Sequence, residues 1–276
     1  MIRIITDSGC DISQAKAKEK GIVVLPLTTI IDNQEYRDGI DIMSNEFYDK
    51  LVNSNVTPST SQVSPGAFLD AFEQYKDDDI LCITISSKLS GCFQSACLAA
   101  KEFDNVKVID SQLVSLASHI FIELAVSYVE QGLDIDTIVS KLEQDKLKCR
   151  AFAYFDTLEY LKRGGRISAT TATAGTLLNI KPIATLQNGV LDMLGKVRGV
   201  KKAGSFVVDK IKEKGNIDTS RPVIVAYSGN DEQIALNFIE KNKETLGLDT
   251  VEIMQIGPTI GTHAGPGAVA ISYFEQ

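Results

Sequence analysis

Short apolar segments alternate with helical patterns along almost the whole chain, and this alternation limits the folds open to it. The segment 2–5 is a β-branched run, 79–85 (DILCITI) has the composition of a buried strand, and 106–109 is another short strand. Helical patterns separate these segments. Such a rhythm is typical of helices covering a parallel sheet. We therefore predict an α/β fold class, with a mostly parallel sheet and flanking helices in the N-terminal half.

Local signals place the elements of that half. Pro65 stands at a first helical position, Asp134 can cap a helix, and Pro26 places part of its segment at a sheet edge. The expected strands are 2–5, 21–31, 79–85 and 106–109. The expected helices are 45–53, one opening at Ser64-Pro65, 91–103, 113–130 and one from Asp134 through Leu147.

The second half has a different pattern, with an Asn188-Gly189 turn that predicts a β-hairpin. The other expected strands are 151–155, 222–227 and 249–256, and the expected helices are 168–178, 199–215 and 231–246. A glycine-rich stretch, GPTIGTHAGPGAVAISYF, closes the chain and is expected to be loop around its histidine. We predict an N-terminal α/β domain at 1–150 and a C-terminal α/β domain with a β-hairpin at 151–276.

Charge and composition exclude several classes of protein. The chain has 28 Lys and Arg against 36 Asp and Glu, which gives a formal net charge of −8. Nucleic-acid binding needs surplus positive charge, so no nucleic-acid partner is expected. No stretch approaches the roughly 18 consecutive apolar residues of a membrane span, so membrane contact is expected to be transient at most.

Cysteine and histidine usage bears on compartment and metals. The first apolar run is short and reaches an acid at Asp7, which makes a poor signal peptide. Five scattered cysteines are expected to be free thiols in the cytoplasm. With only two histidines and no CxxC or HExxH motif, no metal site is expected.

Two hydroxyl-rich segments are candidates for binding an anion. The segment 57–66 (TPSTSQVSPG) contains Thr60 and Ser61, and it could equally be an ordinary turn before a helix. The segment 83–95 runs from a buried strand through Ser90-Gly91 into a helix, where amides and the helix dipole favour an anion. Ser90 could equally be a simple N-cap.

His263 stands among glycines that let a ligand approach the backbone closely. It could contact a ligand, or it could be a core histidine. His119 lies in an apolar helix, where a structural or surface role is expected. The sequence has no GxSxG elbow and no assignable third group, so a serine hydrolase is disfavoured.

Two basic stretches could dock a partner of this acidic chain. The first contains Lys196, Arg198, Lys201 and Lys202, and the second is LKRGGR at 161–166. The alternative for the first stretch is a solvated helix start. Local positive charge on an acidic protein can steer an acidic partner.

Taken in order, these motifs resemble the DegV family, the bacterial fatty-acid-binding proteins that serve fatty acid kinase. The matching pieces cover essentially the whole chain: ITDSGCD, LPLTTIIDNQEYRDGID, TPSTSQVSPG, ISSKLSGCFQSA, VIDS, LEYLKRGGRIS, NGVLDMLGKVRG and IGTHAGPGAVAISY. Each motif alone is weak, whereas the ordered set is highly specific.

The resemblance implies two α/β domains and a long-chain fatty acid held in an enclosed tunnel. The residues implied for its carboxylate are Thr60, Ser61, Ser90, Gly91 and His263. The implied partner is the catalytic subunit of fatty acid kinase, which would phosphorylate the bound ligand to an acyl-phosphate. The expected docking residues are Arg198, Lys201 and Lys202. The chain itself would be a non-catalytic carrier without a cofactor; the alternative is a small-molecule enzyme or phosphoryl-transfer protein that uses His263.

Overall fold

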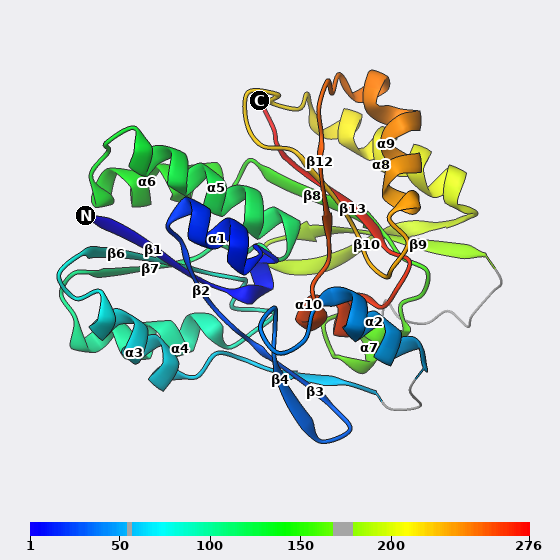
Figure 1. Cartoon of the computed structure of the whole chain (residues 1–276). Helices are drawn as coiled ribbons and strands as arrows, with labels where there is room; N and C mark the ends of the chain where they lie inside the picture. Colours follow the sequence, from blue (N-terminus) through cyan, green and yellow to red (C-terminus); the bar gives the residue numbers. More distant parts are fainter. Residues whose placement is uncertain (54–56, 168–178) are drawn as a thin grey trace.

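The computed structural model describes residues 1–53, 57–167 and 179–276. The strands of these residues form three sheets, and helices cover the two larger ones (Figure 1). The predicted α/β fold class is confirmed.

The first sheet is parallel throughout and is built from N-terminal strands in the order β2-β1-β6-β7. These strands are β1 (Ile2–Asp7), β2 (Val23–Leu25), β6 (Asp79–Thr84) and β7 (Val106–Asp110). Their side chains alternate between faces. Ile4 and Leu81 join the core cluster that contains much of the long helix α5, whereas Ile5 and Ile80 join the cluster of α3 and α4.

The helices of this half begin within three residues of their predicted starts, except for the helix at 14–20, which was not predicted. They are α1 (Gln14–Lys20), α3 (Pro65–Gln74), α4 (Cys92–Ala99), α5 (Leu116–Glu130) and α6 (Ile135–Asp145), with short 3-10 turns η1 (Ser8–Cys10) and η2 (Ala100–Glu102). Ser64 and Asp134 are confirmed as N-caps, since their side chains accept from Ala67 N and Thr137 N. In Figure 1, α5 and α6 lie on one side of the sheet and α3 and α4 on the other.

The second sheet is mixed, in the order β10-β9-β8-β13-β11-β12. Its strands are β8 (Cys149–Tyr154), β9 (Ile180–Gln187), β10 (Val190–Arg198), β11 (Ile224–Tyr227), β12 (Glu252–Gln255) and β13 (Val269–Phe274). The predicted hairpin is β9–β10, with Asn188 and Gly189 both at positive φ in its turn. Helices α8 (Val200–Lys214) and α9 (Gln233–Leu246) share a core cluster with one face of this sheet.

Helix α5 packs against the other face of the second sheet, through β8, β11 and β13. Because it also packs on the first sheet, most of its side chains are buried, including those of Ser118 and His119. A helix buried on all sides needs an apolar sequence all round. A structural or surface role was expected for His119, and this burial favours the structural one.

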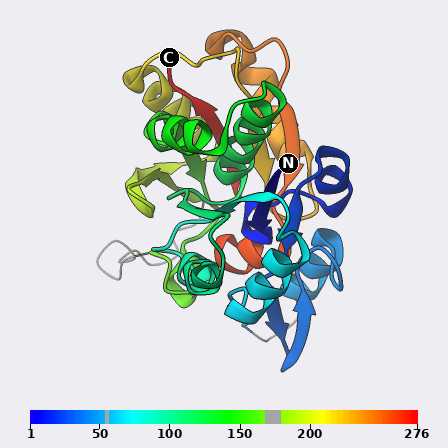
Figure 2. The same cartoon turned by 90° about the vertical axis from the view of Figure 1, so that its left-hand side faces the viewer.

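The third sheet is small and antiparallel, in the order β4-β3-β5. It comprises β3 (Thr28–Ile31), β4 (Gln34–Arg37) and β5 (Ser59–Ser61). Figures 1 and 2 show the β3–β4 hairpin at the opposite end of the molecule from the C-terminus. Three further helices complete the fold: α2 (Ser44–Asn53), α7 (Glu159–Arg163) and α10 (Pro258–Ala264). Helix α10 contacts α2, α7, β3 and β5.

Three predictions on local structure have different outcomes. The segment 21–31 is not one strand, because it divides at Pro26 into β2 and β3, which belong to different sheets. His263 is not on a loop, because it lies in α10. The predicted helix 168–178 lies outside the described residues.

The division into domains at residue 150 stays a prediction. The second sheet begins with β8 at Cys149, while α10 from the C-terminal half packs on the third sheet. Within the described residues, no helix is both long and apolar enough to cross a membrane.

Candidate functional site

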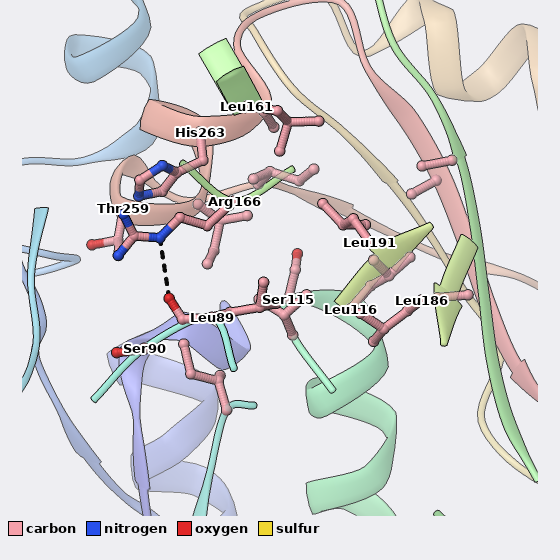
Figure 3. Close-up of a pocket in the computed structure, with 18 of the residues that line it drawn as sticks. Leu89, Ser90, Ser115, Leu116, Leu161, Arg166, Leu186, Leu191, Thr259 and His263 are labelled. Carbon is pink, nitrogen blue, oxygen red and sulfur yellow. Dashed lines mark hydrogen bonds between the residues drawn. The ribbon is translucent and has the colours of Figure 1, made fainter. Parts of the chain in front are cut away.

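A cavity of about 360 Å³ lies among the two large sheets, the start of α5 and helix α10. Most of its wall is apolar and comes from both halves of the chain, as with Ile85, Leu116, Phe152, Leu186 and Leu191. Figure 3 shows Leu116, Leu186 and Leu191 toward one side, and Arg166, Thr259 and His263 toward the other. The cavity therefore has an apolar end and a polar end.

Thr60 and His263 meet at the polar end. Thr60 Oγ1 lies 2.9 Å from His263 Nε2, which joins strand β5 to helix α10. Burial, and secondarily the positive charge of Arg166, lower the pKa of His263 to about 4. The imidazole is therefore neutral near pH 7. Its other nitrogen, Nδ1, is buried and has no hydrogen-bond partner among the described residues.

Gly164 makes room for the His263 ring at the end of α7. A Cβ atom built at this position would lie 2.0 Å from His263 Nδ1. The φ of Gly164 is −73°, so the backbone conformation is open to any residue. Glycine is needed here for the space it leaves beside the ring.

Ser90 and Gly91, two of the predicted site residues, also line the cavity, but Ser90 is not the N-cap. Gly91 holds that position for α4. Ser90 Oγ accepts from Cys92 N at 3.4 Å and donates to Cys92 Sγ at 3.2 Å. A thiol sulfur is a weak hydrogen-bond acceptor. The Ser90 hydroxyl can therefore turn toward a stronger acceptor, such as a carboxylate, at little cost in free energy.

Ser61 lines the cavity beside Thr60, and Gln62 completes that wall. Gln62 Nε2 donates to Ser95 Oγ at 2.8 Å, and its amide lies directly against Gly91. This contact holds the β5 segment onto the start of α4. The two hydroxyl-rich segments therefore meet through Gln62, which is not among the predicted site residues.

Arg166 is a cavity residue that the sequence analysis placed only in a basic docking stretch. Its Nε donates to Leu89 O at 3.1 Å, as Figure 3 shows, and its Nη1 donates to Gly164 O. No carboxylate of the described residues forms an ion pair with it. A guanidinium without a protein carboxylate partner leaves positive charge at the polar end.

The other predicted functional residues lie elsewhere. Arg198, Lys201 and Lys202 are exposed at the end of β10 and the start of α8, and they do not line the cavity. All five cysteines are free. Among the described residues, no cluster of three His, Cys, Asp or Glu side chains could hold a metal ion.

Three comparisons place the chain among known proteins. A family model described as "Uncharacterised protein, DegV family" matches residues 1–276. A DegV domain-containing protein of Caldanaerobacter subterraneus is 38% identical over 280 residues, covering 100% of this chain and 99% of that protein. A Thermus thermophilus DegV family protein, described for its fatty acid binding, superposes with a TM-score of 0.91 at 32% identity, covering 100% and 99% of the two chains.

A third protein shares the fold at lower identity. The Streptococcus pneumoniae fatty acid kinase (Fak) B3 protein, loaded with linoleic acid, superposes with a TM-score of 0.88 at 24% identity, covering 100% of both chains. Its ligand is a long-chain fatty acid.

Proposed function

This chain belongs to the DegV family, and from that premise we propose that it binds a long-chain fatty acid and presents the carboxylate to a fatty acid kinase. The observation that carries the proposal is the two-ended cavity, in which an apolar wall leads to Thr60, His263 and Arg166. The fatty acid binding described for the Thermus relative supports it.

The apolar end suits an acyl chain. Transfer of each buried methylene from water is worth about 0.8 kcal/mol, so a C16 chain with about 14 methylenes gains roughly 11 kcal/mol. Ordering the chain and losing its free motion reduce this gain. A ligand held this strongly would leave slowly, which suits a carrier whose cargo is processed while bound.

The polar end suits a carboxylate. The neutral His263 ring must choose a tautomer, and its Nδ1 faces no acceptor among the described residues. A proton on Nδ1 would be buried without a partner, so the Nε2–H tautomer is favoured. His263 then donates to Thr60 Oγ1, which leaves the Thr60 hydroxyl proton free for the fatty acid carboxylate.

The remaining polar groups complete the proposed carboxylate site. Ser61 and Ser90 supply hydroxyls, and Gly91 lets the ligand approach the start of α4. Arg166 supplies the cation that an anion in an apolar cavity otherwise lacks. With Arg166 included, the site can both hydrogen-bond the carboxylate and balance its charge.

The proposed partner is the catalytic subunit of a cytoplasmic fatty acid kinase. Arg198, Lys201 and Lys202 form an exposed basic patch outside the cavity, suited to an acidic partner surface. The ordered motifs support this role, and the Streptococcus protein with the same fold is named for the kinase. In this proposal the kinase supplies the ATP chemistry and the chain supplies the bound acid.

The alternative, an enzyme that uses His263, has less support. A general base near neutral pH needs a pKa near the working pH, whereas burial lowers that of His263 to about 4. Thr60 is the hydrogen-bond partner of its ring, and no carboxylate of the described residues orients the imidazole. These observations favour a binding role for His263.

The direct test is denaturing extraction of the purified protein followed by mass spectrometry. We expect long-chain fatty acid at about one mole per mole of protein. Protein stripped of lipid should take up added fatty acid and, with the kinase and ATP, yield acyl-phosphate. Stripped protein that takes up no fatty acid at all would contradict the proposal.

A further inference from the structure

We propose that Asp11 is the positioning residue of the candidate site: it joins the start of α5 to the start of α10 and so keeps His263 against Thr60. The inference rests on the proposed function only for the identity of the ligand. Asp11 does not line the cavity, so it acts through the two segments that it connects.

The Asp11 carboxylate contacts both segments directly. Its Oδ1 accepts from Gly257 N at 3.0 Å, and its Oδ2 accepts from Ser115 Oγ at 2.5 Å. Gly257 is the N-cap of α10 and Ser115 immediately precedes α5. One side chain therefore fixes two helix starts that are far apart in the sequence.

On the α10 side, the contact leaves no spare room. A Cβ atom at Gly257 would lie 2.6 Å from Asp11 Oδ1, so glycine is needed for this approach. His263 follows six residues later in a short helix, about 9 Å along the axis at 1.5 Å per residue. A small tilt at Gly257 therefore moves the imidazole relative to Thr60.

On the α5 side, the contact holds a strained residue in the cavity wall. Ser115 has φ 53° and ψ −131°, a conformation that residues with a side chain rarely adopt. Ser115 N donates to Gly9 O at 2.7 Å, while its hydroxyl donates to Asp11. Such strain persists where the surroundings enforce it. Here the 9–11 segment holds the Ser115 conformation through the Gly9 carbonyl and the Asp11 side chain.

Asp11 lies where a carboxyl group without specific hydrogen bonds would be destabilising. Burial, together with the nearby carboxyls of Asp38 and Asp7, raises the pKa of Asp11 well above its usual value. A buried acid close to two others is costly unless its hydrogen bonds are specific. The Asp11 bonds are specific because they go to the two segments that shape the cavity.

The test follows the His263 imidazole by NMR in lipid-free protein. The chain has only two histidines, so a His119→Gln variant assigns both signals. In the unchanged protein, His263 should remain neutral well below pH 6, because burial and Arg166 lower its pKa to about 4. In Asp11→Ala, we expect the His263 pKa to rise by roughly one unit or more toward its ordinary value, with a changed ring shift.

Two variants separate positioning from general destabilisation. Asp11→Asn keeps an acceptor for Gly257 N and can donate to Ser115, so it should restore the His263 pKa. Asp145→Ala also removes a buried carboxyl, which accepts from Tyr128 Oη and Arg221 Nη1 and has no contact with α10. It should destabilise the protein and leave the His263 signal in place.

The inference is overturned if Asp11→Ala leaves the His263 pKa and shift unchanged, or if Asp145→Ala moves them equally. Should Asp11→Ala not fold, Gly257→Ala provides the same test, because its added Cβ displaces the carboxyl. An unchanged His263 signal in a folded Gly257→Ala would then reject the inference. No fatty acid enters the measurement, so it stands even if lipid extraction contradicts the proposed function.

Discussion

His263 Nε2 and Thr60 Oγ1 lie 2.9 Å apart although 203 positions separate the two residues in the chain. The contact joins helix α10 to strand β5, which pairs with β3 in the small sheet. Thr29, the register partner of Thr60, is itself 3.3 Å from Thr259 of α10 through the two hydroxyl oxygens. Two threonines on neighbouring strands therefore hold one helix, and the polar end of the cavity depends on both.

The first prediction concerns the Thr60 hydroxyl. Thr60→Val keeps the β-branched shape and loses the group that we propose donates to the carboxylate. A hydrogen bond to a charged group is worth about 1.5–3 kcal/mol, so fatty acid affinity should fall roughly tenfold to a hundredfold. Competitive displacement of a fluorescent fatty acid measures this. Ser59→Ala, on the same strand but outside the cavity wall, is the matched control. Equal affinity in Thr60→Val and Ser59→Ala would remove Thr60 from the site.

The second prediction concerns Arg166. Arg166→Gln removes the cation at the polar end and retains a group that can donate to Leu89 O. We expect weaker fatty acid retention and a higher His263 pKa, because the positive charge of Arg166 helps to lower it. Arg163→Gln is the matched control, since Arg163 is exposed and pairs with Glu159 outside the cavity. Lipid retention measured by mass spectrometry should separate the two variants; if both keep a full lipid load, Arg166 is not a ligand-binding residue.

The third prediction concerns the space at Gly164. Gly164→Ala places a methyl group where the His263 ring lies, so the ring must leave Thr60. Fatty acid binding should weaken, while folding is largely kept because the backbone conformation suits alanine. Gly66→Ala is the control, because a Cβ there has its nearest neighbour at 3.8 Å. Normal fatty acid exchange in Gly164→Ala would show that the His263 position is unimportant for binding.

Much of this architecture could be predicted from residues that act locally. Ser64 and Asp134 predict helix starts, Asn188-Gly189 predicts a hairpin, and the ordered motifs indicate the family. Thr60, Ser61, Ser90, Gly91 and His263 line one cavity, as expected of a common site, although their ligand contacts stay a prediction. The helix and turn signals each lie in a few neighbouring residues, whereas the family signal lies in the order of the motifs along the chain.

What escaped prediction depends on tertiary contacts. Helix α10 contains Gly261, which packs directly on Phe47 and Tyr48 of α2, a contact that no local pattern reveals. In the sequence, Arg166 cannot be distinguished from the other basic residues of LKRGGR. Its place at the cavity depends on its tertiary contact with Leu89. The link from Asp11 to both Ser115 and Gly257 spans most of the chain.

The fourth prediction is a pH dependence of stability from Asp7. Burial is the largest cause that raises the pKa of this carboxyl to about 7, against about 3.8 when unfolded. Between these values the folded state binds more protons than the unfolded state, so the contribution of Asp7 to stability falls as pH rises from 4 to 7. Relative to that of Asp7→Asn, the free energy of unfolding of the native protein should fall by up to roughly 4 kcal/mol as pH rises across this window.

Urea unfolding at several pH values measures this difference. Asp41 is the control, because its pKa is shifted in the opposite direction: Arg37 lowers it to about 2. The difference between native protein and Asp41→Asn should therefore be flat above pH 5. A flat profile for Asp7→Asn as well would mean that Asp7 titrates normally in the folded protein.

The last prediction concerns the exposed basic patch of Arg198, Lys201 and Lys202. Arg198 ends β10 and the two lysines lie in the first turn of α8, where all three side chains face solvent outside the cavity. Exposed charges act mainly on the rate and orientation of association and little on folding. Arg198→Glu should therefore leave bound fatty acid and Tm nearly unchanged, while acyl-phosphate formation with the kinase falls. The unchanged protein should also lose activity with the kinase as salt rises, because salt screens exposed charges. Lys214→Glu, at the far end of the same helix, is the matched control. Loss of bound lipid in Arg198→Glu with intact kinase binding would instead place Arg198 in the ligand site.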